Sequence, residues 1–127
     1  MRDKGLTYPV CRDTFVSSVG REVNGNNGGA KRLKVKGPQE YTLLDVDLSS
    51  LKGKIISRAV LHLRSAVPKR APLGRLSIST VASRWVEGRG GNYTNETGSS
   101  CFVQAEFNNR NWSYNGSTVM DLSLIHI

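Results

Sequence analysis

Residues 41–64 read YTLLDVDLSSLKGKIISRAVLHLR, and this stretch decides the fold class. In its first part, Leu44, Val46 and Leu48 alternate with two aspartates. An alternation with a period of two is typical of a β-strand that has one apolar and one polar face. We therefore expect a half-buried strand over residues 41–48, with the three aliphatic side chains in the core.

The second part of this stretch repeats the alternation with basic residues on the polar face. A short polar segment, including one helical turn at 49–51, separates the two parts. We expect a strand over residues 55–64 whose basic outer face suits an acidic partner. Its inward residues are Ala59, Leu61 and Leu63, which alternate with Arg58, Val60, His62 and Arg64.

Glycine, asparagine and proline residues divide the rest of the chain into short segments. Loops are expected at 18–30, 65–72 and 88–100, because glycine and asparagine adopt positive φ at little cost. Several short strands with such punctuation predict an all-β fold, an antiparallel β-sandwich. The further strands are expected at 13–17, at 32–36 with Leu33 and Val35 inward, at 75–79 and at 101–103, and a helical turn at 83–88 is expected to bury Trp85.

The size and composition of the chain fit one domain. With 127 residues it is long enough to bury one core. Because only 38% of its residues are hydrophobic, this core is built from a minority of aliphatic residues. The sequence has no stretch of about 20 apolar residues, so no membrane span is expected. The first residues also lack the apolar run of a secretory signal.

The positive charge is concentrated in one part of the sequence. The formal net charge is +8, and residues 31–75 alone hold eleven basic residues against three acidic ones. This concentration of positive charge creates an electric field that attracts polyanions and speeds their encounter with the protein. The alternative is a basic surface that only keeps the protein soluble.

The order of these signals resembles the DNRLRE-type domain, a jelly-roll family related to carbohydrate-binding modules on polysaccharide-degrading enzymes. The likeness spans about residues 11–120. It implies a jelly roll, a location outside the cell or on its surface, and fusion to further domains. The residues that carry it are Asp13-Thr14-Phe15-Val16, the Gly/Asn loop before Leu33, the stretch from Leu44 to Leu51, the stretch from Ile56 to Leu63, and Trp85-Val86-Glu87-Gly88.

The C-terminal part departs from that family. Its members have further strands and a DNRLRE string, and this sequence has neither. We therefore expect a single, incomplete β-sandwich domain over residues 1–121. Residues 122–127 read LSLIHI and resemble a translated sequencing adapter, which makes a non-native tail the favoured interpretation. A genuine final strand is the alternative.

The expected ligand site is a positive plate on the outer face of one sheet. If the three basic strands lie side by side, arginine forks on the plate can each bind a uronate carboxylate through two hydrogen bonds. Exposed aromatic rings can stack on sugars. The alternative for the basic residues is a solvated face with no partner, and the alternative for the rings is packing against missing strands. The residues of this site are Arg32, Lys34, Lys36, Arg58, His62, Arg64 and Arg75, with Trp112 and Tyr114 as the stacking rings.

Other chemistries have less support in the sequence. Asp45 and Asp47 are expected to form ion pairs and turn caps rather than the two facing carboxylates of a glycosidase. Asp13 and the 24–27 loop offer oxygens for a structural Ca²⁺, but at no diagnostic spacing. The metal ligands stay unknown, and no cofactor is predicted with certainty.

The two cysteines, Cys11 and Cys101, are expected to be separate buried thiols rather than a disulfide. Specific nucleic-acid binding is not expected either, because the aromatic residues do not alternate with the basic ones. The sequence therefore predicts a non-catalytic module that binds an acidic polysaccharide. The alternative is a structural module of a surface protein with no ligand of its own.

Overall fold

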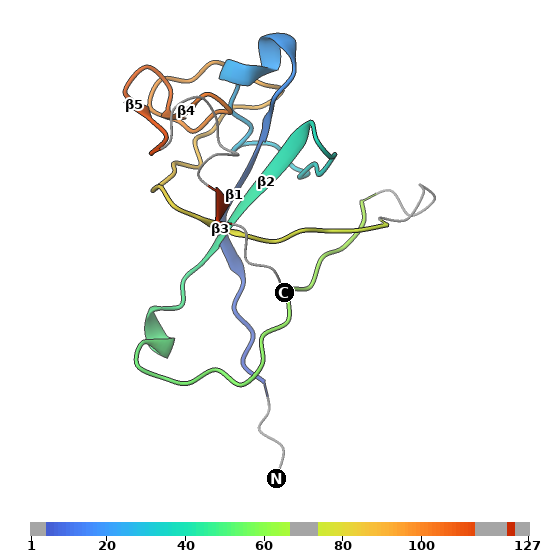
Figure 1. Cartoon of the computed structure of the whole chain (residues 1–127), viewed down its shortest axis with the longest axis vertical. Coiled ribbons are helices and arrows are strands. Elements are labelled where there is room, and N and C mark those ends of the chain that lie inside the picture. The colour runs from blue at the N-terminus through green and yellow to red at the C-terminus, as the bar shows by residue number, and fades with distance from the viewer. Residues whose placement is uncertain (1–4, 67–73, 114–121, 124–127) are drawn as a thin grey trace.

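The longest regular element is an antiparallel pair of strands that runs through the centre of the protein. The computed structural model describes residues 5–66, 74–113 and 122–123. Strand β1 (Val10–Ser17) pairs with β2 (Glu40–Val46), with Thr14 opposite Leu43 in the register. Figure 1 shows this pair joining the upper and lower parts of the molecule. The predicted strands at 13–17 and 41–48 are therefore confirmed in type, although β1 begins earlier, at Val10, and β2 ends earlier, at Val46.

The remaining strands are short and also pair antiparallel. β3 (Thr80–Val81) pairs with β6 (Leu122–Ser123), and β4 (Gln104–Glu106) pairs with β5 (Arg110–Asn111). Two 3-10 turns complete the described part, η1 (Gly20–Asn24) and η2 (Ser49–Leu51), and η2 confirms the predicted helical turn. The described residues thus form three two-stranded antiparallel sheets, and their class is all-β.

Strand β1 is covered on both faces. The four successive side chains from Thr14 to Ser17 are all buried, which in a two-stranded sheet requires a cover of loops on each side. One such loop contains Asn27, whose side-chain amide donates a 3.0 Å hydrogen bond to the carbonyl oxygen of Phe15. Aromatic and β-branched residues favour the strand conformation here, and the loop contacts hold it in place.

Strand β2 turns the opposite face to the core from the one predicted. Leu43 is only 2% exposed, whereas Leu44 and Val46 are half-buried and Leu48 is exposed. The expectation that Leu44, Val46 and Leu48 lie in the core is therefore wrong. A period of two separates the two faces of a strand but does not say which face the rest of the protein covers.

The hydrophobic core lies on the Leu43 face of β2. Leu43, Trp85, Ala105 and Trp112 form its buried cluster, with Val81 packed against it. Trp85 is buried as expected, but residues 84–90 form no helical turn. The predicted strand at 101–103 is also absent, because β4 begins at Gln104.

The glycine-rich segment around Asn26 is a loop, as predicted, and Asn26 and Asn27 in it are buried. The side-chain amide of Asn26 donates to the carbonyl oxygens of Glu87 and Ser100, at 2.8 and 3.0 Å. Its Oδ1 atom accepts from the backbone amides of Gly28 and Gly90, both at 3.0 Å. At Gly28, a Cβ atom would lie 1.9 Å from the Glu87 carbonyl oxygen, so this close approach requires glycine.

The three basic segments do not form strands. Residues 32–36 make one isolated bridge at Lys36, while 55–66 and 74–79 lie outside every sheet of the described residues. Leu33 and Val35, expected inward, are exposed. In Figure 1 the green trace that follows η2 and the yellow trace that leads to β3 both lie outside the compact upper part. An alternating segment buries its apolar face only where another part of the protein covers that face. The described residues provide no such cover for these three segments.

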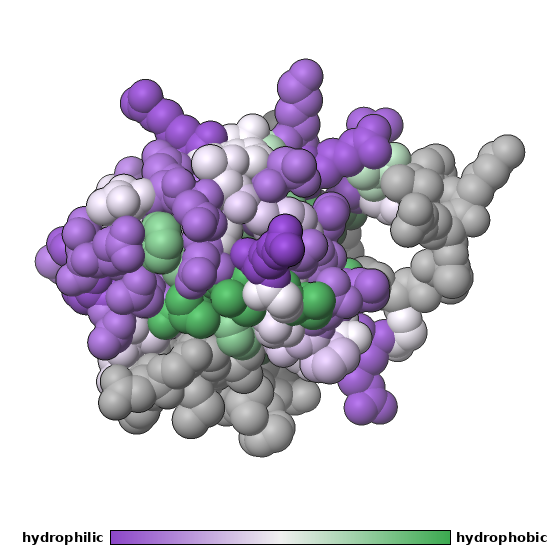
Figure 2. Space-filling view, turned by 90° about the horizontal axis from the view of Figure 1, so that it is seen from above, coloured by the Kyte–Doolittle hydropathy of each residue, from purple (hydrophilic) through white to green (hydrophobic). Residues whose placement is uncertain are grey.

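The surface is mainly hydrophilic. Seen from above, long hydrophilic side chains project from the molecule, and a narrow hydrophobic band crosses the middle of the face (Figure 2). Within the described residues, no helix has the length and apolar character needed to cross a bilayer.

Candidate functional site

A surface depression brings together two arginines that are far apart in the sequence. Arg32 and Arg64 line it together with Ser65 and Ala66, and its volume is about 470 Å³. Both arginines are exposed, and neither has an acidic partner among the described residues. A guanidinium without an internal carboxylate keeps its donors for an external anion.

The other basic candidates are not gathered at this depression. Arg58 and His62 lie on the open segment that leads to Arg64, and Arg75 lies on the segment that returns to β3. All three side chains are exposed, and none of them lines the depression. The single plate on the face of one sheet is therefore wrong, because these segments are not strands of a common sheet.

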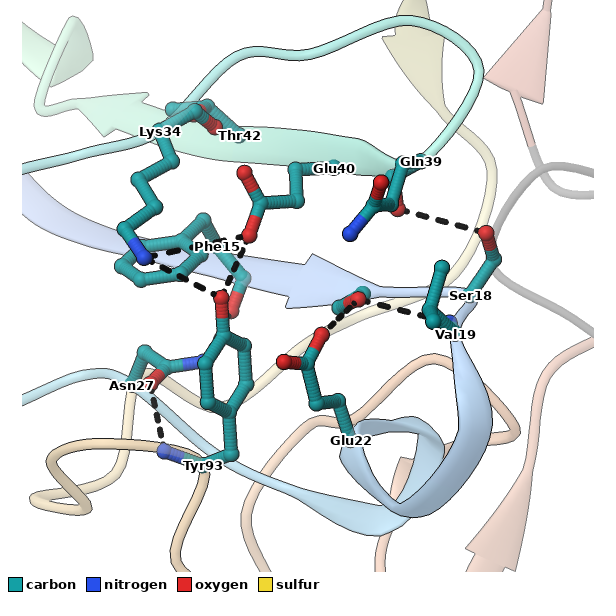
Figure 3. Close-up of polar contacts among 11 residues, drawn as sticks. Phe15, Ser18, Val19, Glu22, Asn27, Lys34, Gln39, Glu40, Thr42 and Tyr93 are labelled. Carbon is teal, nitrogen blue, oxygen red and sulfur yellow. Dashed lines mark hydrogen bonds and ion pairs between the residues drawn. The ribbon is translucent and has the colours of Figure 1, made fainter.

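The Lys34 ammonium group contacts other residues of the protein, although its side chain is 54% exposed. Its ammonium nitrogen lies 5.7 Å from the ring centre of Phe15 and 5.4 Å from that of Tyr93. It also lies 3.3 Å from the Tyr93 hydroxyl and 4.0 Å from a carboxylate oxygen of Glu40, as Figure 3 shows. These contacts indicate a stabilising role for Lys34. Its neighbour Lys36 is exposed.

The partners of Lys34 form a polar cluster below it. The Tyr93 hydroxyl donates a hydrogen bond to the buried carboxylate of Glu40 (Figure 3). The Ser17 hydroxyl donates one to Glu22. Burial, the Glu40 hydrogen bond and the charges of both glutamates raise the pKa of Tyr93 far above its usual range. The contact between Glu40 and Tyr93 could not be predicted from the sequence, because no local pattern links the two residues.

Of the two proposed stacking rings, Trp112 is a core residue. Its side chain is 2% exposed, and its indole N–H donates a 3.1 Å hydrogen bond to the carbonyl oxygen of Cys101. The expectation that Trp112 stacks on a sugar is therefore wrong, since a buried ring offers no face to a ligand. Tyr114 lies outside the described residues.

A second depression carries charges of both signs. Its volume is about 560 Å³, and Arg84, Arg89, Glu87 and Glu96 are among the residues that line it. Glu87 and Glu96 accept backbone hydrogen bonds, from Asp13 at 2.7 Å and from Arg89 at 2.8 Å. Opposite charges lie close together here, so this depression suits a polyanion less well than the Arg32–Arg64 depression does.

The remaining carboxylates of interest have structural partners. Asp45 pairs with Arg12, and the Asp47 carboxylate accepts a 3.0 Å hydrogen bond from the Ser49 amide, which lowers the pKa of Asp47. The predicted ion pair and turn cap are thus confirmed. Partial burial and then the nearby Glu87 carboxylate raise the pKa of Asp13.

The side-chain oxygens of the 24–27 loop that were considered as calcium ligands accept hydrogen bonds within the protein. Oδ1 of Asn26 accepts two backbone hydrogen bonds, and Oδ1 of Asn27 accepts one from the Tyr93 amide at 2.8 Å. Across the described ranges, no group of three His, Cys, Asp or Glu side chains is arranged to hold a metal ion. We therefore derive no role for Ca²⁺ from this loop.

Cys11 and Cys101 are not joined by a disulfide, as expected, but only one of them is buried. Cys11 is exposed on β1, and Cys101 is buried next to the core. Burial raises the pKa of the Cys101 thiol, which makes it a poor nucleophile.

No family model, curated protein or solved structure matches this chain.

Proposed function

We propose that this protein is a non-catalytic binding module for an acidic, uronate-containing polysaccharide. The juxtaposition of Arg32 and Arg64 at one depression carries the proposal. We further propose that the fold is an antiparallel β-sandwich of the jelly-roll type, which is consistent with the small antiparallel sheets. The motif resemblance also favours this function and a place outside the cell or at its surface.

The chemistry of the two arginines suits such a ligand. Each guanidinium can hold a carboxylate through two parallel N–H···O hydrogen bonds, with a geometry that lysine cannot match. A uronate chain carries one carboxylate on each sugar, so two arginines from different segments can bind two carboxylates of one chain. This arrangement gives avidity without a deep pocket.

The surrounding charge supports the same proposal. From residue 48 to residue 86 the sequence contains no aspartate or glutamate, while Lys36, Arg58 and Arg75 add exposed cations on neighbouring segments. These residues contribute to a positive field that attracts a polyanion before contact is made. In this proposal they affect the rate and salt dependence of binding more than its geometry.

Electrophoresis in native gels that contain alginate tests the proposal. The protein is expected to be retarded by alginate and not by a neutral glucan. The double variant Arg32→Glu/Arg64→Glu is expected to migrate freely in both gels. The matched control is Arg21→Glu/Lys52→Glu, which changes the net charge equally at exposed positions outside the depression.

The outcome of this experiment is decided by comparing the two double variants. If both lose retardation equally, only the net charge matters and no site exists at the depression. If the unchanged protein is not retarded by alginate or pectate, the proposal fails. The second candidate function, a structural module, would then be favoured, because exposed aliphatic side chains on 55–63 suit a role in assembly.

A further inference from the structure

Residues 58–64 have the length of a strand but pair with no strand of the described residues. The segment contains no helix, turn or bend, and its seven residues are close to the usual strand length of about 5–6. None of its backbone amides or carbonyls is hydrogen-bonded to another described residue. A row of free backbone donors and acceptors is a template for pairing with another strand.

The side chains of this segment also lack a cover. Val60, Leu61 and Leu63 are 57%, 44% and 56% exposed, although their pattern is that of a half-buried strand. Single exposed aliphatic residues are common on protein surfaces. Here three of the four residues from 60 to 63 are exposed aliphatic residues on one unpaired segment, and together they form an apolar patch. A strand that paired here would bury backbone polar groups and aliphatic side chains in the same step.

The charges indicate which kind of strand fits. Arg58, His62 and Arg64 are the polar residues of the segment, and no acidic residue lies between positions 48 and 86. Antiparallel pairing with the same segment of a second copy would place like charges close together, which is unfavourable. A strand with acidic side chains at alternate positions would instead pair opposite charges across the ladder.

We propose that residues 58–64 are a docking edge for a β-strand of another polypeptide, in which aliphatic and acidic side chains alternate. Recognition is by strand addition: backbone hydrogen bonds supply affinity, and the alternate side chains supply specificity. This inference goes beyond the proposed polysaccharide site. A polysaccharide chain has no peptide ladder, so it needs the arginine side chains and not the backbone amides of Val60 or Leu61.

Binding of a fluorescent peptide of about ten residues with alternating Glu and Val tests the proposal, with a Lys–Val peptide as the control. Val60→Pro and Leu61→Pro are the variants, because proline removes one backbone N–H and keeps every charge. Successive N–H groups of a strand point to opposite edges. We therefore expect one of the two variants to weaken binding of the Glu–Val peptide by about tenfold or more and the other to weaken it little.

The results separate this proposal from the polysaccharide site. Both proline variants should still be retarded by alginate as the unchanged protein is, and their circular dichroism spectra should match that of the unchanged protein, which shows that they are folded. Failure of the Glu–Val peptide to bind, with normal alginate retardation, would overturn the docking edge alone. Loss of retardation by alginate with normal peptide binding would overturn the polysaccharide proposal alone.

Two further outcomes also overturn the docking edge. Peptide binding that falls with Arg58→Glu but is equal in both proline variants would indicate electrostatic attraction without strand pairing. Concentration-dependent self-association that one proline variant removes, with no peptide binding, would assign the edge to a second copy of this chain. Sedimentation velocity of the unchanged protein and both variants measures that association.

Discussion

The hydroxyl of Tyr93 donates a hydrogen bond to the buried carboxylate of Glu40, although the two residues lie 53 positions apart in the sequence. Glu40 begins β2, and Tyr93 lies on the 91–94 loop, where its ring also packs edge-to-face against Phe15 of β1. The contact therefore connects the late loop to the central strands. The Lys34 ammonium lies 4.0 Å from the Glu40 carboxylate and supplies a positive charge that balances it.

Replacing Tyr93 by phenylalanine is expected to destabilise the protein. The change leaves the buried Glu40 carboxylate with Lys34 as its ion-pair partner and removes a charge-assisted hydrogen bond, at a cost of about 1–3 kcal/mol. Chemical denaturation measures the loss. Tyr41→Phe is the matched control, since it removes an exposed hydroxyl bonded to the Pro38 carbonyl oxygen, and it should cost less. Equal losses in the two variants would contradict this role for Glu40.

The stability of the protein is expected to fall at alkaline pH. The folded pKa of Tyr93 is raised above the unfolded value of about 10, so the folded state holds this proton more tightly. The stabilisation that the protonated Tyr93 hydroxyl contributes is complete below the unfolded pKa of about 10. It is lost as the pH rises from there through the folded pKa. Denaturation at several alkaline pH values measures the decline, and Tyr93→Phe should make it shallower. An unchanged slope in the variant would argue against the assignment.

Asn26 is expected to be a main determinant of stability. Asn26→Ala removes four hydrogen bonds and leaves the Gly90 amide and the Ser100 carbonyl without this partner in a buried region. The expected loss is at least about 2 kcal/mol. Asn95→Ala is the control, because Asn95 is exposed in the late loop. A small loss for Asn26→Ala in urea denaturation would show that water replaces these bonds.

Trp112 is expected to affect stability and not ligand binding. Trp112→Phe keeps most of the apolar volume and loses the hydrogen bond to the Cys101 carbonyl, at a cost of about 1–3 kcal/mol. Retardation of the folded variant by alginate should equal that of the unchanged protein. Reduced retardation with little change in stability would restore the stacking role predicted from the sequence.

The central strand pair could be predicted from the sequence because its cues are local. The alternation at 41–48 and the apolar run at 13–17 each specify a strand without reference to the rest of the chain. The choice between Leu43 and Leu44 as the buried side chain could not be predicted, since it depends on where Trp85 and Trp112 pack.

The site was predicted only in part for the same reason. Arg32 and Arg64 were named from strand patterns, and the structure gathers them at a depression although neither segment is a strand. Lys34 carries the same local pattern but turns to Tyr93 and Glu40, two residues that no motif connects to it. Asn26 belongs to a glycine-rich stretch typical of exposed loops, and only its partners at 87–100 explain its burial.

The central claim is that Arg32 and Arg64 together bind carboxylates of one acidic polysaccharide chain. The most direct measurement follows the arginine Nε–Hε signals by nuclear magnetic resonance during titration with an oligouronate. Arg32→Lys and Arg64→Lys assign the two signals. Our account predicts that both signals shift and saturate together, ahead of those of Arg21 and Arg58. Signals of Arg32 and Arg64 that stay unchanged, or that move no more than those of the other exposed arginines, would contradict it.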